Sequence, residues 1–354
     1  MKFCYINTEN IYPQDRHLID GLRENGHDVF ELSEKTPGFR KYLNVIKHFW
    51  VEEKAYDAVF VGFTSPFFVV AMRLTSTKKI FFNAGQSQYE ANIISRNENG
   101  LRPLKIFKWW IIDFISFHLS SLVLLESNAQ IEFIRKLFFV PKRKLVRSWA
   151  GVNEKEFFYD PKVKKRDVFT ALFRGRFLPE SGILTILEAA KKLENDGVRF
   201  LVIGHGFMYR EVNSLMDKLK PSNIEMITEK IPIEELRKKM LECHLSLGQM
   251  ADHPRLKRTL PCKLFESLAM KLPYLTGKNA GALELLEEGK TCFMVEPGNS
   301  TELAQKIIFL KNNPEILKDV AEEGYKLYAE KLTSAELARN FVEMLKKRLS
   351  RNPF

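Results

Sequence analysis

Residues 259–297 read TLPCKLFESLAMKLPYLTGKNAGALELLEEGKTCFMVEP, and they predict a helix, a short strand, a glycine turn and a second helix. Pro261 stands where the first helix begins, and the apolar run at 273–276 predicts the strand. Lys263 and Glu266 are three residues apart on that helix, so their side chains project to the same side. A strand between two helices is typical of a parallel sheet covered by helices.

The pair of Lys263 and Glu266 has two interpretations. A helix that begins after a strand directs free N–H groups at any anion there, and a lysine adds positive charge. A carboxylate beside them can accept hydrogen bonds from vicinal hydroxyls, so the pair would suit a nucleotide-sugar. The alternative is an exposed ion pair on an amphipathic helix, which is the commoner case for two such residues alone.

Length and composition describe a folded protein of more than one domain. The chain has 354 residues and 45% hydrophobic residues, which predicts two globular domains. Its four cysteines show no CxxC spacing, which favours a reducing compartment over a disulfide framework or a zinc site. The first residues do not resemble a signal peptide. We therefore expect a cytoplasmic protein.

The net charge of +11 permits three classes of partner: nucleic acid, an anionic membrane surface or a phosphorylated substrate. Basic residues cluster at 135–147 and 162–166, and either cluster alone is typical of a solvated loop. The chain has no RNP aromatic motif, Cys/His finger or helix-turn-helix signature. We therefore do not expect a nucleic-acid partner.

Strands and helices alternate along the whole chain, and the alternation begins again near its middle. Helices are expected at 15–25, 66–74 and 182–194, with Ser300 as the N-cap of a later one. Further helices are expected to begin near Pro232, Pro261, Ala282, Thr301, Pro314 and Ser334. Strands are expected at 2–7, 28–32, 58–62, 79–83, 122–126, 144–149, 169–174, 200–203, 224–227, 244–247, 274–276 and 292–295.

This order predicts an α/β protein with two Rossmann-like, doubly wound domains that face a central cleft. The first domain is expected at 1–165 and the second at 166–332, joined near 160–167. A helix at 333–354 is expected to cross back to the first domain. Ligands of such sheets bind at the carboxyl ends of the strands, so the site is expected there.

Two turns of the second half could bind phosphate. In FRGRFLPESG, residues 173–182, Gly175 lets the backbone approach an anion and Arg176 offers a fork for phosphate oxygens. The alternative is an ordinary turn with Ser181 as a helix N-cap, and we favour that role for Ser181. In LVIGHGFMYRE, residues 201–211, the GxG pattern is weak evidence by itself, and its histidine is as well explained by an exposed turn.

Taken together, these motifs resemble the retaining glycosyltransferases of family 4, or glycosyl transferases group 1, which have the GT-B fold. The resemblance rests on FRGRFLPESG, VIGHG, IPIEELRKKM, PxKxxE and GALELLEEGKTCFMVEPGN. AGVNEKEFF resembles the family's motif between the two domains, and RENGHDVFEL resembles its first βαβ unit. The resemblance covers nearly the whole chain and is weaker over 30–120.

The resemblance implies site residues. Arg176 matches an arginine that contacts the donor diphosphate, and Glu266 matches a glutamate that binds the donor ribose. Lys263 lies in a PxKxxE variant found among members that build bacterial polysaccharides, and with Arg176 it is expected to act in catalysis. The donor-binding positions are Gly175, Gly204, Gly206, Lys230, Ile231, Glu266, Arg258 and Ser181.

Two positions depart from the family pattern. Ser181 stands where the family usually has lysine, and Arg258 stands where it often has a second glutamate. We expect the cluster of Arg255, Lys257, Arg258 and Lys263 to supply the missing positive charge. This hypothesis fails if Lys263→Ala and Arg258→Ala both leave donor affinity unchanged.

The resemblance also implies a mechanism. Retaining members need no paired carboxylates, because the leaving phosphate oxygen takes the acceptor proton on the same sugar face. Arg176 and Lys263 would then act by stabilising charge on the diphosphate. The chain has no DxD-like motif that we trust, so we expect no metal and no cofactor besides the nucleotide-sugar substrate.

The first domain is expected to bind the acceptor. Candidate loops leave its strand ends at 8–17, 62–66 and 83–90, and they contribute His17, Gln86 and Gln88. Family members often have a histidine in the third loop, where this chain has the two glutamines. We therefore predict no catalytic histidine in this loop.

Residues 101–119, LRPLKIFKWWIIDFISFHL, are apolar on almost every side, with basic residues and two tryptophans near the start. Such a helix could lie in a membrane interface or pack in the interior, and one helix could do both. Asp113 and His118 interrupt a run that is too short to span a bilayer.

The function expected from the sequence is therefore transfer of a sugar from a nucleotide-sugar to a glycan or to a polyprenyl-linked or other lipid-linked acceptor. The setting would be cell-surface polysaccharide synthesis, with the enzyme peripheral on the inner face of the membrane. The alternative is a catalytically impaired GT-B scaffold or binding protein, motivated by Ser181 and Arg258.

Overall fold

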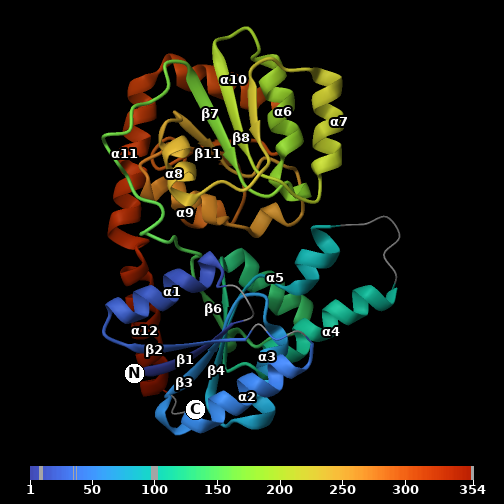
Figure 1. The fold of residues 1–354 in the computed structure, drawn as a ribbon, viewed down its shortest axis with the longest axis vertical. Coiled ribbons are helices and arrows are strands. Elements are labelled where there is room, and N and C mark those ends of the chain that lie inside the picture. Colours follow the sequence, from blue (N-terminus) through green and yellow to red (C-terminus); the bar gives the residue numbers. More distant parts are fainter. Residues whose placement is uncertain (8–10, 35, 37, 97–102, 352–354) are drawn as a thin grey trace. The chain divides into compact units, whose positions relative to one another are not determined.

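The contacts between residues divide the chain into two α/β units, Met1–Asn153 with Leu332–Phe354, and Glu154–Lys331 (Figure 1). The computed structural model describes every residue except 8–10, 35, 37, 97–102 and 352–354, and the side chains of 349–351 are also left undescribed. The division after Asn153 precedes the border expected at 165, so residues 154–165, which were expected in the first domain, belong to the second unit.

The first unit is built on a six-stranded sheet in the order β2-β1-β3-β4-β5-β6, with every neighbouring pair parallel. The strand order changes direction between β1 and β3, so the switch point of the sheet lies between these two neighbouring strands. The strands are β1 Lys2–Asn7, β2 Asp28–Ser33, β3 Ala58–Val61, β4 Lys79–Gly85, β5 Leu122–Leu125 and β6 Leu145–Arg147.

Helices complete the first unit, and one of them comes from the far end of the chain. In α12, Phe341 is buried with its ring centroid 5.6 Å from that of Phe60 in β3. Gly21 of α1 lies so close to α12 that a Cβ there would be 2.0 Å from the carbonyl oxygen of Ser334. The helices are α1 Pro13–Glu24, α2 Arg40–Glu52, α3 Pro66–Thr75, α4 Pro103–Leu119, α5 Asn128–Phe138 and α12 Ser334–Arg351.

The second unit repeats this plan with a parallel sheet in the order β12-β11-β10-β7-β8-β9. Its switch point lies between β7 and β10, at the centre of the sheet. The strands are β7 Phe169–Arg174, β8 Val198–Ile203, β9 Ile224–Ile227, β10 Leu245–Leu247, β11 Tyr274–Gly277 and β12 Phe293–Val295.

Helix α6 of the second unit buries an apolar stripe that includes Ile186, Leu187 and Ala190, whereas α9 is buried on every side from Lys263 to Ala269. Such stripes cover both faces of a parallel sheet, whose strands are therefore apolar throughout. The helices are α6 Ile183–Lys192, α7 Tyr209–Leu219, α8 Ile233–Leu241, α9 Cys262–Ala269, α10 Ser300–Asn312 and α11 Pro314–Lys331.

All twelve expected strands are present, but some helix predictions were wrong. The helix expected near Ala282 is only the 3₁₀ turn Ala282–Glu284, because the following chain turns back to form the bridge of Glu288 with Cys292. The N-cap of α10 is Asn299 rather than Ser300, since the Asn299 side chain accepts a hydrogen bond from the N–H of Glu302.

Helices α2, α5 and α7 were not predicted. The sequence did contain a signal for α5, because Ser127 and Gln130 have the spacing of a capping box. In the structure the Ser127 hydroxyl accepts a hydrogen bond from the Gln130 N–H at 2.9 Å. Neither α2 nor α7 has a side-chain cap, so their beginnings carried no comparable signal.

Candidate functional site

Two glycine turns lie against each other at the carboxyl ends of β7 and β8. The Gly175 N–H donates to the Ile203 carbonyl at 3.0 Å, which joins the end of β7 to the end of β8. A Cβ on Gly204 would lie 1.9 Å from the carbonyl oxygen of Gly175. Gly204 is therefore required for the two turns to touch, as expected where backbone must approach backbone closely.

Gly206 has a similar role one step further along the second turn. Its Cβ would lie 2.8 Å from both the nitrogen and the oxygen of Phe177. The Phe177 N–H in turn donates to the His205 carbonyl at 3.1 Å. The His205 ring is exposed and stacks on Tyr209, with centroids 4.4 Å apart, so it forms part of an exposed turn.

Lys263 reaches this pair of turns from the first turn of α9. It is 9% exposed, and its Nζ lies 3.9 Å from the centroid of the Phe173 ring. The Nζ is also 3.5 Å from the Gly248 carbonyl, a long hydrogen bond, and 3.2 Å from where a Cβ on Gly175 would lie. The ammonium thus lies at the switch point between β7 and β10.

The surroundings of Lys263 disfavour its charge. Burial is the main reason why its pKa is lowered to about 7, and the nearby positive charge of Arg174 lowers it further. The negative charge of Glu266 acts in the opposite direction. A buried ammonium in this condition gains stability from any anion that enters the site.

Glu266 is 2% exposed and forms an ion pair with Arg174, the last residue of β7. The interpretation of Lys263 and Glu266 as an exposed ion pair is therefore wrong, because both are buried and Glu266 pairs elsewhere. Arg174 was not predicted to be a site residue. The sequence feature that could have identified Arg174 is its position, because it is a charged residue at the end of an apolar strand and immediately before Gly175.

The other residues expected to contact the diphosphate are arranged differently. Arg176 is exposed on the turn after β7, and its guanidinium has no polar partner within the described part of the chain, although its carbonyl accepts from the Leu178 N–H at 3.0 Å. The Ser181 side chain is buried and donates to the Leu178 carbonyl at 2.6 Å. The N-cap position of α6 is Gly182 in a left-handed conformation, one residue later than predicted. The Ser181 hydroxyl nevertheless accepts a long hydrogen bond, 3.4 Å, from the N–H of Ile183, the first residue of α6.

The basic cluster expected near Arg258 is only partly available for a ligand. Arg255 forms an ion pair with Glu180, which is completely buried beside the β7 turn. Lys257 is exposed and Arg258 is half-buried, both in the 3₁₀ turn Leu256–Arg258. Arg255 therefore stabilises the second unit internally.

Lys230 and Ile231 follow β9, the edge strand beyond β8. Lys230 is exposed and Ile231 is half-buried. The Gly204 N–H donates to the Ile227 carbonyl at 2.9 Å, which ties the end of β9 to the second glycine turn. The residues expected to bind the nucleotide-sugar therefore follow four adjacent strands of the second sheet, β9, β8, β7 and β10, at their carboxyl ends.

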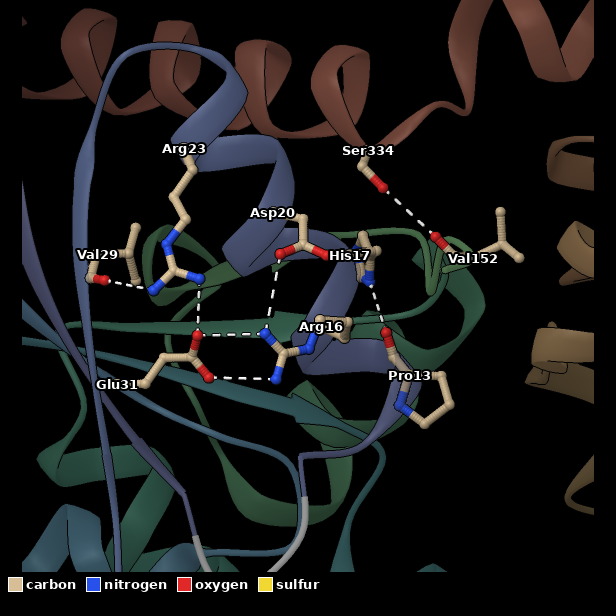
Figure 2. Close-up of polar contacts among 9 residues, drawn as sticks. All are labelled: Pro13, Arg16, His17, Asp20, Arg23, Val29, Glu31, Val152 and Ser334. Atoms are coloured by element: carbon tan, nitrogen blue, oxygen red, sulfur yellow. Dashed lines mark hydrogen bonds and ion pairs between the residues drawn. The ribbon is translucent and has the colours of Figure 1, made fainter. Parts of the chain in front are cut away.

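In the first unit, His17 lies inside α1 rather than in a loop, so the loop expected at 8–17 was wrong for the part from Pro13 onward. His17 is buried, and its Nδ1 is 3.1 Å from the Pro13 carbonyl (Figure 2). Burial lowers the pKa of His17 to about 4, so the ring is neutral at physiological pH. Because the His17 side chain is buried, it is not exposed for contact with an acceptor.

The exposed face of the same helix carries an ion-pair network instead. Arg16 and Arg23 both bind the Glu31 carboxylate, and Arg16 also lies 3.8 Å from Asp20 (Figure 2). The Ser334 hydroxyl, at the start of α12, donates to the Val152 carbonyl at 3.4 Å. The ion pairs hold α1 against β2, and the Ser334 hydrogen bond ties the start of α12 to the segment after β6.

A buried polar cluster that was not predicted lies at the switch point of the first sheet. Asp15 accepts hydrogen bonds from the Tyr5 hydroxyl at 2.8 Å and from the Asn83 amide at 2.9 Å. Burial raises the pKa of Asp15 to about 6. Beside it the buried Asn7 amide has no hydrogen-bond partner within the described residues. No motif in the sequence connected these residues, because they meet only through the fold.

Gln86 and Gln88 follow β4 and are half-buried. The Gln88 N–H donates to the Asp113 carboxylate at 3.1 Å, and the Asn92 amide donates to the Gln88 carbonyl at 2.8 Å. Gln88 therefore helps to hold the segment after β4 against α4. An acceptor role for the two glutamines stays a prediction.

No group of three His, Cys, Asp or Glu side chains suited to a metal ion occurs within the described ranges. The expectation of metal-independent chemistry stays a prediction. In the same part of the chain, no helix is both long and apolar enough to cross a bilayer.

Comparison with known proteins shows what the second unit is similar to. Residues 154–327, nearly the whole second unit, match the family model described as glycosyl transferases group 1. An uncharacterised glycosyltransferase of Methanocaldococcus jannaschii is 26% identical over 183 residues, covering 52% of this chain and 48% of that protein. An alpha-D-kanosaminyltransferase of Streptomyces kanamyceticus is 26% identical over 162 residues, covering 45% and 41%. The matches therefore span half or less of these relatives.

Solved structures show the same fold over the whole chain. HepE of Anabaena in complex with UDP and glucose superposes with a TM-score of 0.74 at 14% identity, covering 98% of this chain and 100% of that one. Sucrose-phosphate synthase from Thermosynechococcus elongatus superposes with a TM-score of 0.76 at 14% identity, covering 99% and 100%. The expectation of a GT-B fold with two doubly wound units is confirmed.

Proposed function

We propose that this chain, whose residues 154–327 belong to the glycosyl transferases group 1 family, is a retaining glycosyltransferase that uses a nucleotide-sugar donor. The acceptor would be a glycan or a lipid-linked sugar in cell-surface polysaccharide synthesis. One observation carries the proposal: a buried lysine and a buried glutamate lie beside two touching glycine turns at the switch point of the second sheet.

Each part of the donor has a matching group in this proposal. Lys263 offers an ammonium against the Gly175 turn, where the backbone lets a diphosphate approach. Glu266 offers a carboxylate one helical turn further along α9 for the ribose hydroxyls. The segment after β9, with Lys230 and Ile231, would lie beside the base.

The reaction needs charge stabilisation more than acid–base chemistry. The bond between the sugar and the donor phosphate breaks, and the acceptor oxygen bonds to the sugar on the same face. The leaving phosphate oxygen takes the acceptor proton, so Lys263 and Arg176 need only stabilise the negative charge that grows on the diphosphate. A cation held in a buried site does this without reorganisation. Under this proposal the chain needs no metal ion.

The first test is a thermal-shift panel of nucleoside diphosphates and nucleotide-sugars. A ligand that binds only the folded protein raises its melting temperature by mass action. We expect nucleotides of one base to raise the melting temperature of the unchanged protein. Glu266→Ala should abolish this increase. Glu188→Ala, a control at an exposed position of α6, should retain it. No shift with any nucleotide would contradict the proposal.

A non-catalytic scaffold or binding protein is the second candidate. The observation that favours it is the buried Ser181 side chain, which brings no charge to the place where the family usually has lysine. The two candidates differ in turnover. Release of nucleoside diphosphate from the bound donor in the presence of acceptor supports the enzyme, and binding without any release supports the scaffold.

We further propose that α4 places the enzyme on the inner face of a membrane. Its inner side is buried at Asp113, Ser116 and Phe117, whereas Leu104 is 83% exposed and Phe107 is 60% exposed. Lys108, also exposed, lies over the Trp109 ring at 5.2 Å. Exposed apolar and basic residues on one helix suit an anionic lipid surface.

Sedimentation with vesicles tests this role of α4. We expect the protein to sediment with vesicles of phosphatidylserine and phosphatidylcholine at low salt, and Leu104→Asp with Phe107→Asp to abolish this. Phe309→Asp is the matched control, because Phe309 is 48% exposed on α10 of the other unit. No sedimentation of the unchanged protein at low salt would contradict the membrane role.

A further inference from the structure

Lys263 and Glu266 lie three residues apart on α9, yet they form no ion pair with each other. Residues at this spacing on a helix are neighbours, and opposite charges there normally attract. Within the described part of the chain, no carboxylate lies within ion-pair distance of the Lys263 ammonium. Something therefore holds the Glu266 carboxylate away from the lysine.

Arg174 holds it. The guanidinium donates to Oε2 of Glu266, whose side chain is 3% exposed, while the Arg174 side chain is 29% exposed. Arg174 is fixed by its backbone in β7, directly before Gly175, and its guanidinium carbon lies 5.3 Å from the centroid of the Phe157 ring. A buried carboxylate needs a charged partner, and an arginine keeps its charge at every physiological pH.

The arrangement leaves the Lys263 ammonium poorly satisfied. An ammonium has three donors. Here its contacts are the Gly248 carbonyl at 3.5 Å and the face of the Phe173 ring at 3.9 Å. The charged groups that act on it are Arg174 from β7 and Glu266 from its own helix, with Arg174 disfavouring its charge. The Gly175 turn lies directly against this ammonium, because a Cβ on Gly175 would be 3.2 Å from the Lys263 Nζ.

We infer that Arg174 is a positioning residue that keeps Glu266 away from Lys263, so that the Lys263 ammonium stays available for the donor diphosphate. The inference rests on the proposed nucleotide-sugar site. Removing Arg174 frees the carboxylate, which then pairs with the lysine one turn away on α9. A diphosphate must break that pair before it can bind.

Inorganic pyrophosphate is the probe that isolates this effect, because it has no ribose for Glu266 to bind. Its affinity is measured by isothermal titration calorimetry at low salt for the unchanged protein, Arg174→Met, Glu266→Gln and the double variant. We expect Arg174→Met to bind about tenfold more weakly, within the usual range for coupled neighbours. Glu266→Gln should bind at least as tightly as the unchanged protein, and the double variant should regain most of the loss.

Recovery in the double variant separates positioning from direct contact. If Arg174 touched the diphosphate itself, the double variant would bind as weakly as Arg174→Met, and that result would overturn the inference. Unchanged binding by Arg174→Met would overturn it as well. Arg174→Lys, which keeps a cation for Glu266, is expected to bind close to the unchanged protein, and the melting temperature of each variant reports whether it is folded.

The controls also distinguish this inference from the proposed function. Pyrophosphate binding that is lost in Lys263→Met but unaffected by Arg174→Met leaves the donor site standing and overturns the inference alone. No binding of pyrophosphate or nucleoside diphosphate by the unchanged protein overturns both. A second readout is the pH at which pyrophosphate binding begins to weaken. Arg174→Met should move this pH upward, because loss of the Arg174 charge raises the pKa of Lys263.

Discussion

Lys263 carries its charge at a place where burial disfavours charge. The sequence predicted that the lysine and Glu266 would project to the same side of a helix, and it could not exclude an ordinary exposed pair. The structure buries both and pairs the glutamate with Arg174. Partner choice among charged residues depends on which strands and helices meet, and local spacing does not contain that information.

Donor affinity should therefore depend on pH through Lys263. With a pKa lowered to about 7, the ammonium is protonated below that pH and loses its proton above it. Anion binding needs the charged form, so affinity should be constant at lower pH and fall by up to about tenfold per unit as the pH rises above neutrality. A nucleotide-sugar is the right ligand, because its diphosphate is a diester with no proton to lose in this range.

The measurement is the dissociation constant of the nucleotide-sugar from pH 6 to pH 9. Lys263→Met serves as the control and should bind weakly at every pH, with no slope. A flat profile in the unchanged protein would show that Lys263 does not supply charge to the donor.

At the scale of elements, the glycine turns after β7 and β8 decide whether the site can form. Their importance was predicted only weakly, because GxG after a strand is common. The physical reason appears in the structure, where the two turns are in contact through backbone atoms. Which turns touch follows from the strand order, and the strand order is set by the whole sheet.

Gly204→Ala should damage both stability and binding. Its Cβ would lie 1.9 Å from the Gly175 carbonyl oxygen, and backbone cannot move aside cheaply. We expect a free energy of unfolding lower by about 2 kcal/mol or more and a lost thermal shift with nucleotides. The readouts are denaturant unfolding and the same thermal-shift panel.

Gly289→Ala is the matched control for this change. Gly289 has a φ of +75° but nothing within 4 Å of an added Cβ, so only backbone strain of about 1 kcal/mol is expected. Equal losses in the two variants would show that packing of the two turns against each other contributes nothing.

At the scale of the whole molecule, the chain returns to the unit where it began. The sequence predicted a helix at the end and its return to the first domain. In the structure α12 belongs to the first unit, where it packs on α1 and adds Ala338, Phe341, Val342 and Leu345 to the core. The unit thus has a core built from two segments far apart in the sequence.

Phe341→Ala should destabilise the first unit and leave the nucleotide site intact. Its ring lies 5.6 Å from that of Phe60 and 6.1 Å from that of Phe81, measured between centroids. Removing a buried phenylalanine costs about 3–5 kcal/mol. Hydrogen exchange should therefore increase in the first unit, while the affinity for nucleoside diphosphate, whose proposed site lies in the second unit, stays unchanged.

Glu343→Ala, an exposed change on the same helix, is the control for helix propensity. It should alter hydrogen exchange little in either unit. Loss of nucleotide binding in Phe341→Ala would contradict the assignment of the donor site to the second unit alone.

The sequence by itself determined the alternation of strands and helices and the two parallel sheets, because buried parallel strands are continuous apolar runs and glycine turns separate them from helices. It also marked Lys263, Glu266 and the glycine turns as one constellation. Only the tertiary structure decided that Arg174 pairs with Glu266, that His17 is buried, and that the second unit begins at Glu154. These outcomes depend on contacts between distant segments, and such contacts form only when the sheets assemble.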